Sequence, residues 1–466
     1  MHAWGWHLDP ADASGTMQDE LKLRYGEERL PRYTSYPTAP HFSPEIDGDT
    51  YRGWLASLAP ERSASLYLHV PFCRSMCWYC GCHTTITRRE TPILDYVALL
   101  EREIEQVADC LQHPLRVRHV HFGGGTPTVM EPRELERLMA VLRRRFQFEP
   151  EAEVAVEIDP RTLTPAMTEA LGRTGFTRAS LGVQSFDDAV QQAINRIQSV
   201  EETARAADAL RAAGVRAVNF DLIYGLPYQT IESCIETVEA CLPMRPDRFS
   251  VFGYAHVPAF KKHQRKIEES SLPDSAARLA QADAISAVLV GAGYRQIGLD
   301  HFALPEDEMS RALDERRLRR NFQGYTTDPS DVLLGFGASA IGRLDAGYVQ
   351  NEVHLGRYAE RVAAGSLPTV KGCRLSPDDV LRAEIIERIM CDFSVDLEQV
   401  CRKHGLPMDQ LVASSPKLSV LQADDVIRLD GARLTVRDEM RPLVRAVASG
   451  FDAYLPRSSG LHSRAV

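Results

Sequence analysis

Three cysteines lie within eight residues of this chain, as Cys73, Cys77 and Cys80 in the run Cys-Arg-Ser-Met-Cys-Trp-Tyr-Cys. Thiolates are soft ligands that suit iron–sulfur clusters, and each iron of a cubane cluster takes a ligand of its own. Three neighbouring cysteines therefore leave one iron without a protein ligand. The unequal gaps between them let the side chains point inward from different turns of one short loop. The spacing predicts a [4Fe-4S] cluster with one iron open to another molecule.

Two alternatives are open for the same cysteines. A structural zinc site needs four ligands, which Cys82 or His83 could complete, but zinc sites usually pair two separated ligand couples. A disulfide framework is less favoured, because ten cysteines in 466 residues is ordinary usage and no apolar secretory leader is visible, so we expect a reducing cytoplasm. The other cysteines lack ligand spacing and are expected to be buried small hydrophobic residues: Cys110, Cys234, Cys241, Cys373, Cys391 and Cys401.

The composition limits the classes of function. A chain of 466 residues with 44% hydrophobic content can form two or three domains, or one large barrel with additions. No apolar run reaches the length of a membrane helix. The formal net charge of −10 argues against a nucleic-acid surface. We therefore expect small molecules or individual proteins as partners, and neither membrane nor nucleic acid.

The elements that must position the cysteines alternate between strand and helix from residue 65 to about residue 292. This order is typical of parallel βα units that close, or partly close, into a barrel. Helix starts are visible at Pro132, at Thr164-Pro165 and at a capping box of Ser199 and Glu202. Six short apolar runs predict the strands of an α/β fold, a partial (β/α)6 TIM-like barrel open on one side: Leu66–Val70, Val117–Phe122, Val154–Ile158, Arg178–Val183, Val218–Ile223 and Phe249–Tyr254.

The rest of the chain divides around this barrel. We expect an N-terminal arm (1–60) with a mobile leader over its first thirty residues, the barrel (61–305), a connector or lid (306–375) and a mainly helical C-terminal domain (376–466). The last domain contains a predicted β-hairpin that turns at Asp430-Gly431. Helices around a hairpin are also found in winged-helix proteins. Acidic and basic residues balance after Lys371, however, so a packing or substrate-covering domain is favoured over a DNA-binding one.

Polar residues follow the predicted strands at their carboxyl ends, where parallel barrels place their active sites. A glycine run lets backbone approach a ligand and could offer N–H and C=O groups to an amino-acid moiety, while carboxylates suit ribose hydroxyls. Each motif alone could be a tight turn or a helix cap. Their common position predicts one site at the barrel mouth, built from Gly123-Gly124-Gly125-Thr126, Glu157, Asp159, Gln184, Asp221 and Ala255-His256.

The cysteine spacing, the aromatic residue before the third cysteine and the predicted barrel resemble the radical S-adenosylmethionine enzymes. The Gly81-Cys82 extension, the run from Pro31 to Thr38 and the segment 219–227 are similar to oxygen-independent coproporphyrinogen III oxidases, from about residue 30 to residue 454. The resemblance implies that a 5′-deoxyadenosyl radical, made from S-adenosylmethionine, drives loss of carbon dioxide from two propionates of coproporphyrinogen III. The products would be two vinyl groups on protoporphyrinogen IX, in anaerobic haem and porphyrin synthesis.

The resemblance also implies roles for individual residues. Cys73, Cys77 and Cys80 would ligate one [4Fe-4S] cluster, and Cys82 would act without being a ligand, near the substrate or in late electron transfer. Two S-adenosylmethionine molecules are expected. Tyr67, Gly124, Glu157 and Ile341 would contact the first, and Tyr79, Gly125, Thr126, Gln184, Arg196, Asp221 and Ala255 the second.

Alternatives to these roles stay open. Without the resemblance, Tyr67 and Ile341 would be core residues and Arg196 would form a surface ion pair. Arg32 and Arg161 are candidates for binding the substrate carboxylates. A ferredoxin or flavodoxin is the expected electron donor, and the protein is expected to be a monomer.

The rival functions are a haem-binding chaperone of the same fold and an enzyme that opens the haem ring. The sequence Gly81-Cys82-His83 and the N-terminal Arg-Tyr-Thr-Ser-Tyr-Pro favour the oxidase over the chaperone.

Overall fold

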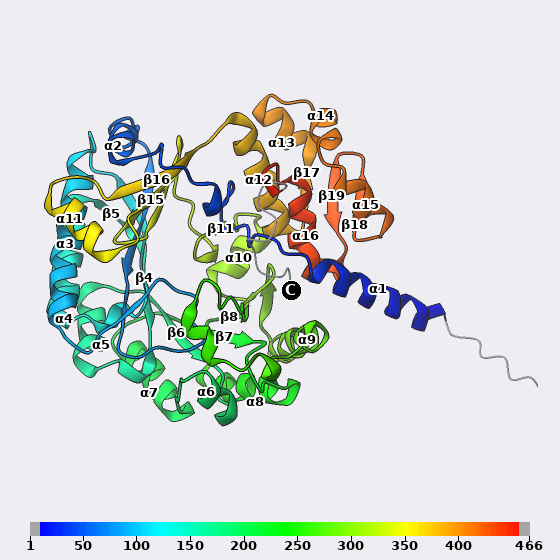
Figure 1. Ribbon diagram of the computed structural model, residues 1–466, viewed down its shortest axis with the longest axis horizontal. Helices are drawn as coiled ribbons and strands as arrows, with labels where there is room; N and C mark the ends of the chain where they lie inside the picture. The colour runs from blue at the N-terminus through cyan, green and yellow to red at the C-terminus, as the bar shows by residue number, and fades with distance from the viewer. Residues whose placement is uncertain (1–9, 456–466) are drawn as a thin grey trace, which may run out of the picture.

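A computed structural model describes residues 10–455 of the chain (Figure 1). Its main body is a twelve-stranded sheet in the order β16-β15-β14-β13-β1-β4-β5-β6-β7-β8-β10-β9. The strands from β13 to β8 are parallel, and the two ends of the sheet do not pair with each other, so the barrel is open. The strands of this sheet are β1 (Ser63–Val70), β4 (Arg116–Gly124), β5 (Gln147–Ile158), β6 (Arg178–Gln184), β7 (Ala217–Tyr224), β8 (Arg248–Gly253), β9 (Arg295–Ile297), β10 (His301–Ala303), β13 (Val332–Phe336), β14 (Ile341–Leu344), β15 (Gly347–Asn351) and β16 (Thr369–Arg374).

The six predicted strands are confirmed as β1 and β4 to β8, in the predicted order. A seventh parallel strand, β13, pairs with β1 on its other side, and β14 to β16 extend the sheet antiparallel. These four strands come from the segment that we expected to be a connector or lid. Its glycines resemble loop signals, but they are needed where backbones approach closely: a Cβ on Gly335 would lie 2.5 Å from the Ile341 carbonyl oxygen.

Helices surround the outer face of the barrel strands (Figure 1). The three predicted starts are confirmed: a helix begins at Pro132, the Thr164 hydroxyl accepts a hydrogen bond from the Met167 N–H, and the Ser199 hydroxyl accepts one from the Glu202 N–H. The helices are α1 (Pro10–Gly26), α2 (Gly48–Ala56), α3 (Thr91–Asp109), α4 (Pro132–Arg145), α5 (Pro165–Thr174), α6 (Asp188–Ala193), α7 (Val200–Ala212), α8 (Ile231–Cys241), α9 (Ser275–Gly291), α10 (Glu308–Asp314), α11 (Leu355–Ala363), α12 (Pro377–Asp392), α13 (Leu397–His404), α14 (Met408–Ala413), α15 (Lys417–Ala423) and α16 (Val444–Ala448). Among residues 10–455, no helix has both the length and the apolar character to cross a membrane.

The C-terminal domain has its own hydrophobic core, and the N-terminal arm is part of it. Tyr25, Leu30, Tyr33 and Tyr36 are buried there among residues of α12, α13 and α16. The first thirty residues are thus not simply a leader: residues 10–26 form α1, which lies beside this domain (Figure 1), while residues 1–9 are outside the described part. The aromatic residues of the arm are core residues of a domain that begins 350 residues later in the chain.

Small sheets complete the fold. The predicted hairpin is confirmed as β18 (Ile427–Asp430) and β19 (Arg433–Val436), with Gly431 at a φ of +59° in the turn, and β17 (Ser394–Asp396) pairs with β19. β2 (Phe72–Cys73) pairs with β3 (Thr85–Ile86), and β11 (Arg319–Asn321) pairs with β12 (Gly324–Thr326). Of the cysteines expected to be buried, Cys373 is only half-buried because it lies in β16 near the edge of the sheet; the other five are buried.

Candidate active site

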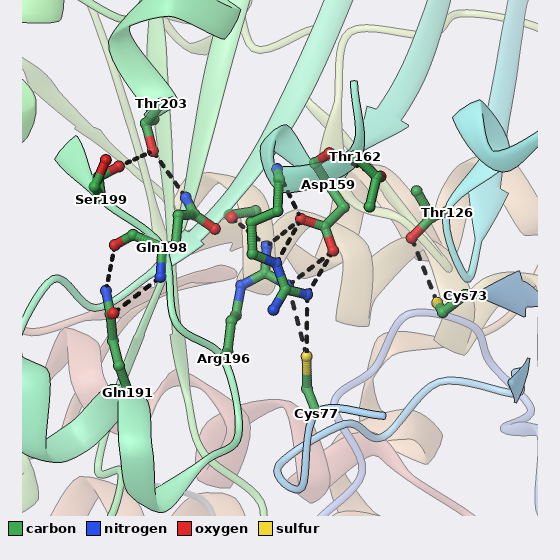
Figure 2. Close-up of polar contacts among 12 residues, drawn as sticks. Cys73, Cys77, Thr126, Asp159, Thr162, Gln191, Arg196, Gln198, Ser199 and Thr203 are labelled. Carbon is green, nitrogen blue, oxygen red and sulfur yellow. Dashed lines mark hydrogen bonds and ion pairs between the residues drawn. The ribbon is translucent and has the colours of Figure 1, made fainter. Parts of the chain in front are cut away.

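The three clustered cysteines lie on the loop that leaves the carboxyl end of β1. The Cys73 sulfur is 3.4 Å from the hydroxyl oxygens of Thr84 and Thr126, and Thr126 belongs to the predicted site (Figure 2). Among residues 10–455, no three His, Cys, Asp or Glu side chains are placed to hold a single metal ion. A four-iron cluster does not require the thiols to converge on one point, because each thiolate binds its own iron.

The surroundings of the thiols favour negative charge. The Cys77 sulfur accepts hydrogen bonds from Arg161 at 3.7 Å and Arg196 at 3.6 Å. A hydrogen bond from Cys82 lowers the pKa of Cys80 to about 6, assisted by the charges of His263 and Lys261 and opposed by burial. Cys77 and Cys80 thus lie near cationic groups that fit an anionic iron–sulfur cluster, whereas burial raises the pKa of Cys73 against the effect of its two threonine partners.

Arg196 is a buried residue of the site rather than part of a surface ion pair. Its side chain is 6% exposed and contacts the Cys77 sulfur, both oxygens of Asp159 and the Gly182 carbonyl oxygen (Figure 2). Asp159 also forms a close pair with Arg161, at 2.6 Å. Asp159 is therefore not a simple helix cap: it balances two guanidinium groups that face the cysteine loop.

Buried amides fix the segment that carries Arg196. Gln191 Nε2 donates to the Gln198 carbonyl oxygen at 2.7 Å, and the Gln198 N–H donates to Gln191 Oε1 at 3.0 Å. Gln198 Nε2 donates in turn to the Thr203 hydroxyl in α7 (Figure 2). Because all three side chains are buried, this network holds the turn before α7 in one geometry and with it the guanidinium group.

The glycine run packs tightly against the cysteine loop. A Cβ on Gly125 would lie 2.5 Å from the Phe72 carbonyl oxygen, and one on Gly124, whose φ is +117°, would lie 2.8 Å from the His69 ring. No larger residue fits at either position. The N–H groups of Gly124, Gly125 and Thr126 donate to Glu157, Val70 and Phe72 respectively. The run was expected to offer N–H groups to a ligand, but these three are already used within the protein.

Tyr67 and Glu157 both lie next to Gly123 of the glycine run. Two histidines that were not predicted from the sequence, His69 and His121, lie with them. His121 Nε2 lies 3.1 Å from Glu157 Oε1, and the rings of His121 and Tyr67 stack at 5.9 Å. Burial opposes ionisation of Glu157, but the His121 and Gly124 contacts outweigh it and hold its pKa below the usual range. His69 and His121 lie on the same inward face of the sheet as Tyr67 and Glu157. Because side chains alternate between the two faces of a strand, this two-residue period could have identified both histidines from the sequence.

His69 carries a defined proton. Its Nε2 is 3.0 Å from the His83 carbonyl oxygen, which can only accept, so Nε2 donates there and Nδ1 accepts from the Tyr67 hydroxyl at 3.1 Å. Burial lowers the pKa of His69. The imidazole is therefore neutral and ties β1 to the cysteine loop.

Asp221 lies on the inner face of β7, and its carboxylate can accept more hydrogen bonds than the protein supplies. It accepts hydrogen bonds from Ser180 at 2.7 Å and Asn219 at 2.8 Å. Burial raises its pKa to about 6, and the charge of Glu157 acts in the same direction against the hydrogen bonds. Asp221 and Glu157 thus face the same barrel interior.

Gln264 connects two predicted site residues and was missed from the sequence. Its Nε2 donates to the carbonyl oxygens of Tyr79, at 2.9 Å, and Ala255, at 3.2 Å, and the side chain is fully buried. It follows β8 within a polar, basic stretch, where nothing in the sequence distinguishes it from a surface residue. Gln264 brings the cysteine loop and the end of β8 together.

Two other predicted residues have less direct links to the cysteines. Gln184 is buried at the end of β6 with a φ of +69°, beside the Gly182–Arg196 contact. Ile341 begins β14, and no hydrogen bond or ring contact joins it to the cysteine loop in the described residues; the preceding turn at Gly337 lies against the His69 backbone. A cavity of about 60 Å³ between the arm, β11 and α12 includes none of the predicted site residues.

Comparisons with known proteins agree with this arrangement. A family model described as the radical SAM superfamily matches residues 67–241, and one described as the HemN C-terminal domain matches residues 375–442. The oxygen-independent coproporphyrinogen III oxidase of Bradyrhizobium diazoefficiens is 60% identical, over 97% of this chain and 100% of that protein. The protein of the same name from Paracoccus denitrificans is 41% identical, over 96% of this chain and 98% of that protein.

A solved structure is similar over almost the same length. Coproporphyrinogen III oxidase from Escherichia coli, described as a radical SAM enzyme, superimposes with a TM-score of 0.87 and 37% sequence identity. The match covers 92% of this chain and 100% of that chain. The barrel, the added strands and the C-terminal domain therefore have a common arrangement in both proteins.

Proposed function

The chain belongs to the family of oxygen-independent coproporphyrinogen III oxidases, and on that premise we propose how its residues carry out the reaction. It is a radical S-adenosylmethionine oxidoreductase of porphyrin synthesis. Two propionates of coproporphyrinogen III lose carbon dioxide and become vinyl groups, which gives protoporphyrinogen IX. The observation that carries the proposal is the contact between the cysteine loop, through the Cys77 sulfur, and the buried Arg196–Asp159 pair at the carboxyl ends of the strands.

Cys73, Cys77 and Cys80 would hold the [4Fe-4S] cluster. When bound, the cluster and S-adenosylmethionine would supply the electron and the radical chemistry for hydrogen abstraction at the propionate β-carbon. The chain supplies position and charge. Arg161 and Arg196 offset the negative charge of the thiolates, while buried aromatic and apolar side chains around the loop exclude water.

We propose two S-adenosylmethionine sites on opposite sides of the glycine run. Tyr67, Gly124, Glu157 and Ile341 would form the first, where the ionised Glu157 accepts hydrogen bonds. The second would use Asp221 for ribose hydroxyls and Arg196 for a carboxylate, in a pocket framed by Tyr79, Gly125, Thr126, Gln184 and Ala255. Support comes from Gln264, which links Tyr79 to Ala255, and from Arg196, whose buried Nε has no hydrogen-bond partner among residues 10–455.

A single incubation tests the function. Protein reconstituted with iron and sulfide is mixed anaerobically with coproporphyrinogen III, S-adenosylmethionine and dithionite, and the products are separated by chromatography. We expect protoporphyrinogen IX and two 5′-deoxyadenosines for each product formed. Absence of product from protein with an intact cluster would contradict the function, and one bound S-adenosylmethionine per chain would contradict the second site.

Cys82 is proposed to act after radical formation and not as a cluster ligand. It is exposed, and its backbone N–H donates to the Cys80 sulfur at 3.4 Å. We expect Cys82→Ser to keep the iron content and 5′-deoxyadenosine formation, and to lower protoporphyrinogen formation about tenfold or more. Iron analysis measures the cluster content, and the ratio of protoporphyrinogen to 5′-deoxyadenosine measures the loss of the later step. Loss of the cluster in this variant would show that Cys82 is a ligand.

An electron donor must reach the cysteine loop, and we propose that it binds at the segment Lys261–Lys266. Five of these six residues are Lys, Arg or His, in a chain of net charge −10. The segment lies against the loop: His263 contacts the Cys80 carbonyl oxygen at 2.7 Å, and Lys261 donates to the Cys82 carbonyl oxygen at 2.9 Å. A basic surface fits an acidic low-potential carrier, such as a ferredoxin or flavodoxin, acting on a monomeric cytoplasmic enzyme.

Charge reversal tests this surface. Lys262 and Arg265 are exposed, and no hydrogen bond, ion pair or ring contact joins them to the cysteine loop among residues 10–455. Lys262→Glu/Arg265→Glu is therefore expected to lower flavodoxin-supported activity about tenfold at low ionic strength. Dithionite-supported activity should stay at the wild-type level. The matched control is Arg428→Glu/Arg433→Glu on the distant hairpin. Equal flavodoxin-supported rates in both double variants would place the donor elsewhere.

A further inference from the structure

Four arginines from separate parts of the chain meet near the carboxyl ends of β7 and β8. Arg32 comes from the arm, Arg278 from α9, Arg320 from β11 and Arg445 from α16. The charges of Arg32, Arg278 and Arg445 all act on Tyr224, the last residue of β7, and those of Arg32 and Arg320 act on Arg445. We call these four residues the arginine cluster.

Backbone carbonyls hold the arginine cluster in place. Arg32 donates to the Gly253 carbonyl oxygen at 3.3 Å and Arg278 to that of Tyr254 at 2.9 Å. The Arg320 side chain donates to the Arg32 carbonyl oxygen at 3.2 Å, and Arg445 Nε to that of Pro31 at 3.0 Å. These acceptors are neutral, so the contacts fix the guanidinium groups without removing their charge.

Within residues 10–455, neither the Arg32 nor the Arg320 side chain pairs with a carboxylate, and one terminal nitrogen of Arg320 is buried without a hydrogen-bond partner. The nearby carboxylates have other partners. Asp300 pairs with His301 at 2.7 Å, Asp452 accepts from the Tyr33 hydroxyl at 3.0 Å, and Glu387 accepts from the Arg320 backbone N–H at 3.2 Å and pairs with Arg319. The guanidinium groups of Arg32 and Arg320 are therefore the ones that an anion can reach.

The like charges are unfavourable to one another in the protein alone. Burial, followed by repulsion from Arg32 and Arg320, lowers the pKa of Arg445 to about 9. An arrangement that repels itself at a barrel mouth is expected where an anion binds. The other basic candidate, Arg161, is already engaged by Asp159 and the Cys77 sulfur, and is not offered to a ligand in the same way.

We propose that the arginine cluster binds propionate carboxylates of the substrate, with Arg320 and Arg32 making the contacts and Arg445 behind them. This inference rests on the proposed function, since coproporphyrinogen III carries four such carboxylates. Guanidinium groups match carboxylates with two parallel hydrogen bonds. The cluster reaches Gly253, two residues before Ala255 of the proposed second S-adenosylmethionine site, so a bound carboxylate places the macrocycle over the barrel mouth.

Affinity for a stable analogue tests the proposal. Fluorescence titration measures binding of coproporphyrin III and of its uncharged tetramethyl ester to the reconstituted enzyme. Arg320→Gln and Arg32→Gln are each expected to weaken coproporphyrin III binding by roughly tenfold or more and to leave ester binding unchanged. The KM for coproporphyrinogen III rises, whereas iron content and S-adenosylmethionine affinity do not change.

A matched control lies next to Arg320 in the same strand. Arg319 pairs with Glu387 at 3.5 Å, so Arg319→Gln is expected to bind coproporphyrin III like the wild type. Arg320→Lys, which keeps the charge but not the paired hydrogen bonds, should recover part of the affinity. Arg32 is exposed, so its substitution leaves the core intact.

The outcomes separate the site from the function. Wild-type affinity in both glutamine variants, with normal conversion by the wild type, would overturn the arginine cluster as the carboxylate site and leave the function standing. Equal weakening of the acid and the ester would also overturn it, because the arginines would then act on the fold. A wild-type enzyme that neither binds coproporphyrin III nor converts coproporphyrinogen III would overturn the proposed function itself.

Discussion

Cys77→Ala is expected to remove the iron–sulfur cluster and with it the activity. Cys77 is buried, and its sulfur accepts hydrogen bonds from two guanidinium groups that alanine would leave without this partner. Iron should fall from about four per chain to below about one, and 5′-deoxyadenosine formation by at least about three orders of magnitude. Iron analysis, the visible absorbance of the cluster and a dithionite-driven cleavage assay measure the effect.

The control for this prediction is Cys373→Ala. Cys373 is half-buried in β16, and the one hydrogen bond of its sulfur among the described residues goes to the neighbouring Arg374 carbonyl oxygen, at 3.6 Å. We expect full iron content and activity in this variant. If Cys77→Ala kept four irons, the assignment of Cys73, Cys77 and Cys80 as the ligand set would be wrong.

Glu103→Ala is expected to cause a large loss of stability by a substitution outside the site. Glu103 lies in α3, is 1% exposed, and accepts hydrogen bonds from the Gly337 N–H at 2.7 Å, Asn351 at 2.6 Å and the Tyr358 hydroxyl at 2.6 Å. Alanine leaves three buried donors without an acceptor. The free energy of unfolding should fall by about 3–5 kcal/mol in denaturant titrations.

The pH dependence of stability gives a second measurement of the same residue. Burial raises the pKa of Glu103 from 4.5 to about 7, against the effect of its hydrogen bonds. The folded state therefore binds the proton more tightly, so this contribution to stability is complete below about pH 4.5 and is lost as the pH rises through 7. Glu103→Gln should remove that part of the pH dependence.

The control is Glu105→Ala in the same helix, where a partly exposed carboxylate pairs with Arg144 and Arg145. Its expected cost is below about 1 kcal/mol. An equal cost for the two alanine variants would mean that the buried hydrogen bonds of Glu103 contribute nothing specific. Because Glu103 fastens the turn before Ile341, its loss should also weaken S-adenosylmethionine binding.

The barrel could be predicted from sequence because its strands are buried on both faces and appear as short apolar runs. Strands β13 to β16 could not be predicted in this way, because their glycines resemble loop signals in the sequence. The close backbone contacts that require these glycines are visible only once the strands are paired. Tyr33 and Tyr36 resembled a family motif, but their burial depends on helices more than 300 residues away. The domain boundaries, the role of each site residue and the second S-adenosylmethionine molecule remain predictions.

The mouth itself was predictable from the common position of polar residues at strand ends. The partners of those residues were not. Without the family resemblance, Arg196 would have been assigned to a surface ion pair, but the fold places it between Asp159 and Cys77. Gln264 had no signal in the sequence at all. Side-chain partners from different loops depend on tertiary packing, which one-dimensional spacing does not encode.

The burial of the arm in the C-terminal core has a consequence for how the enzyme is made. Tyr25, Leu30 and Tyr33 leave the ribosome first, but α16, which completes their core, is synthesised last. All strands of the barrel and the cysteine loop are therefore synthesised before Arg445. The core that places Arg32 beside Arg445 can form only after α16 has left the ribosome.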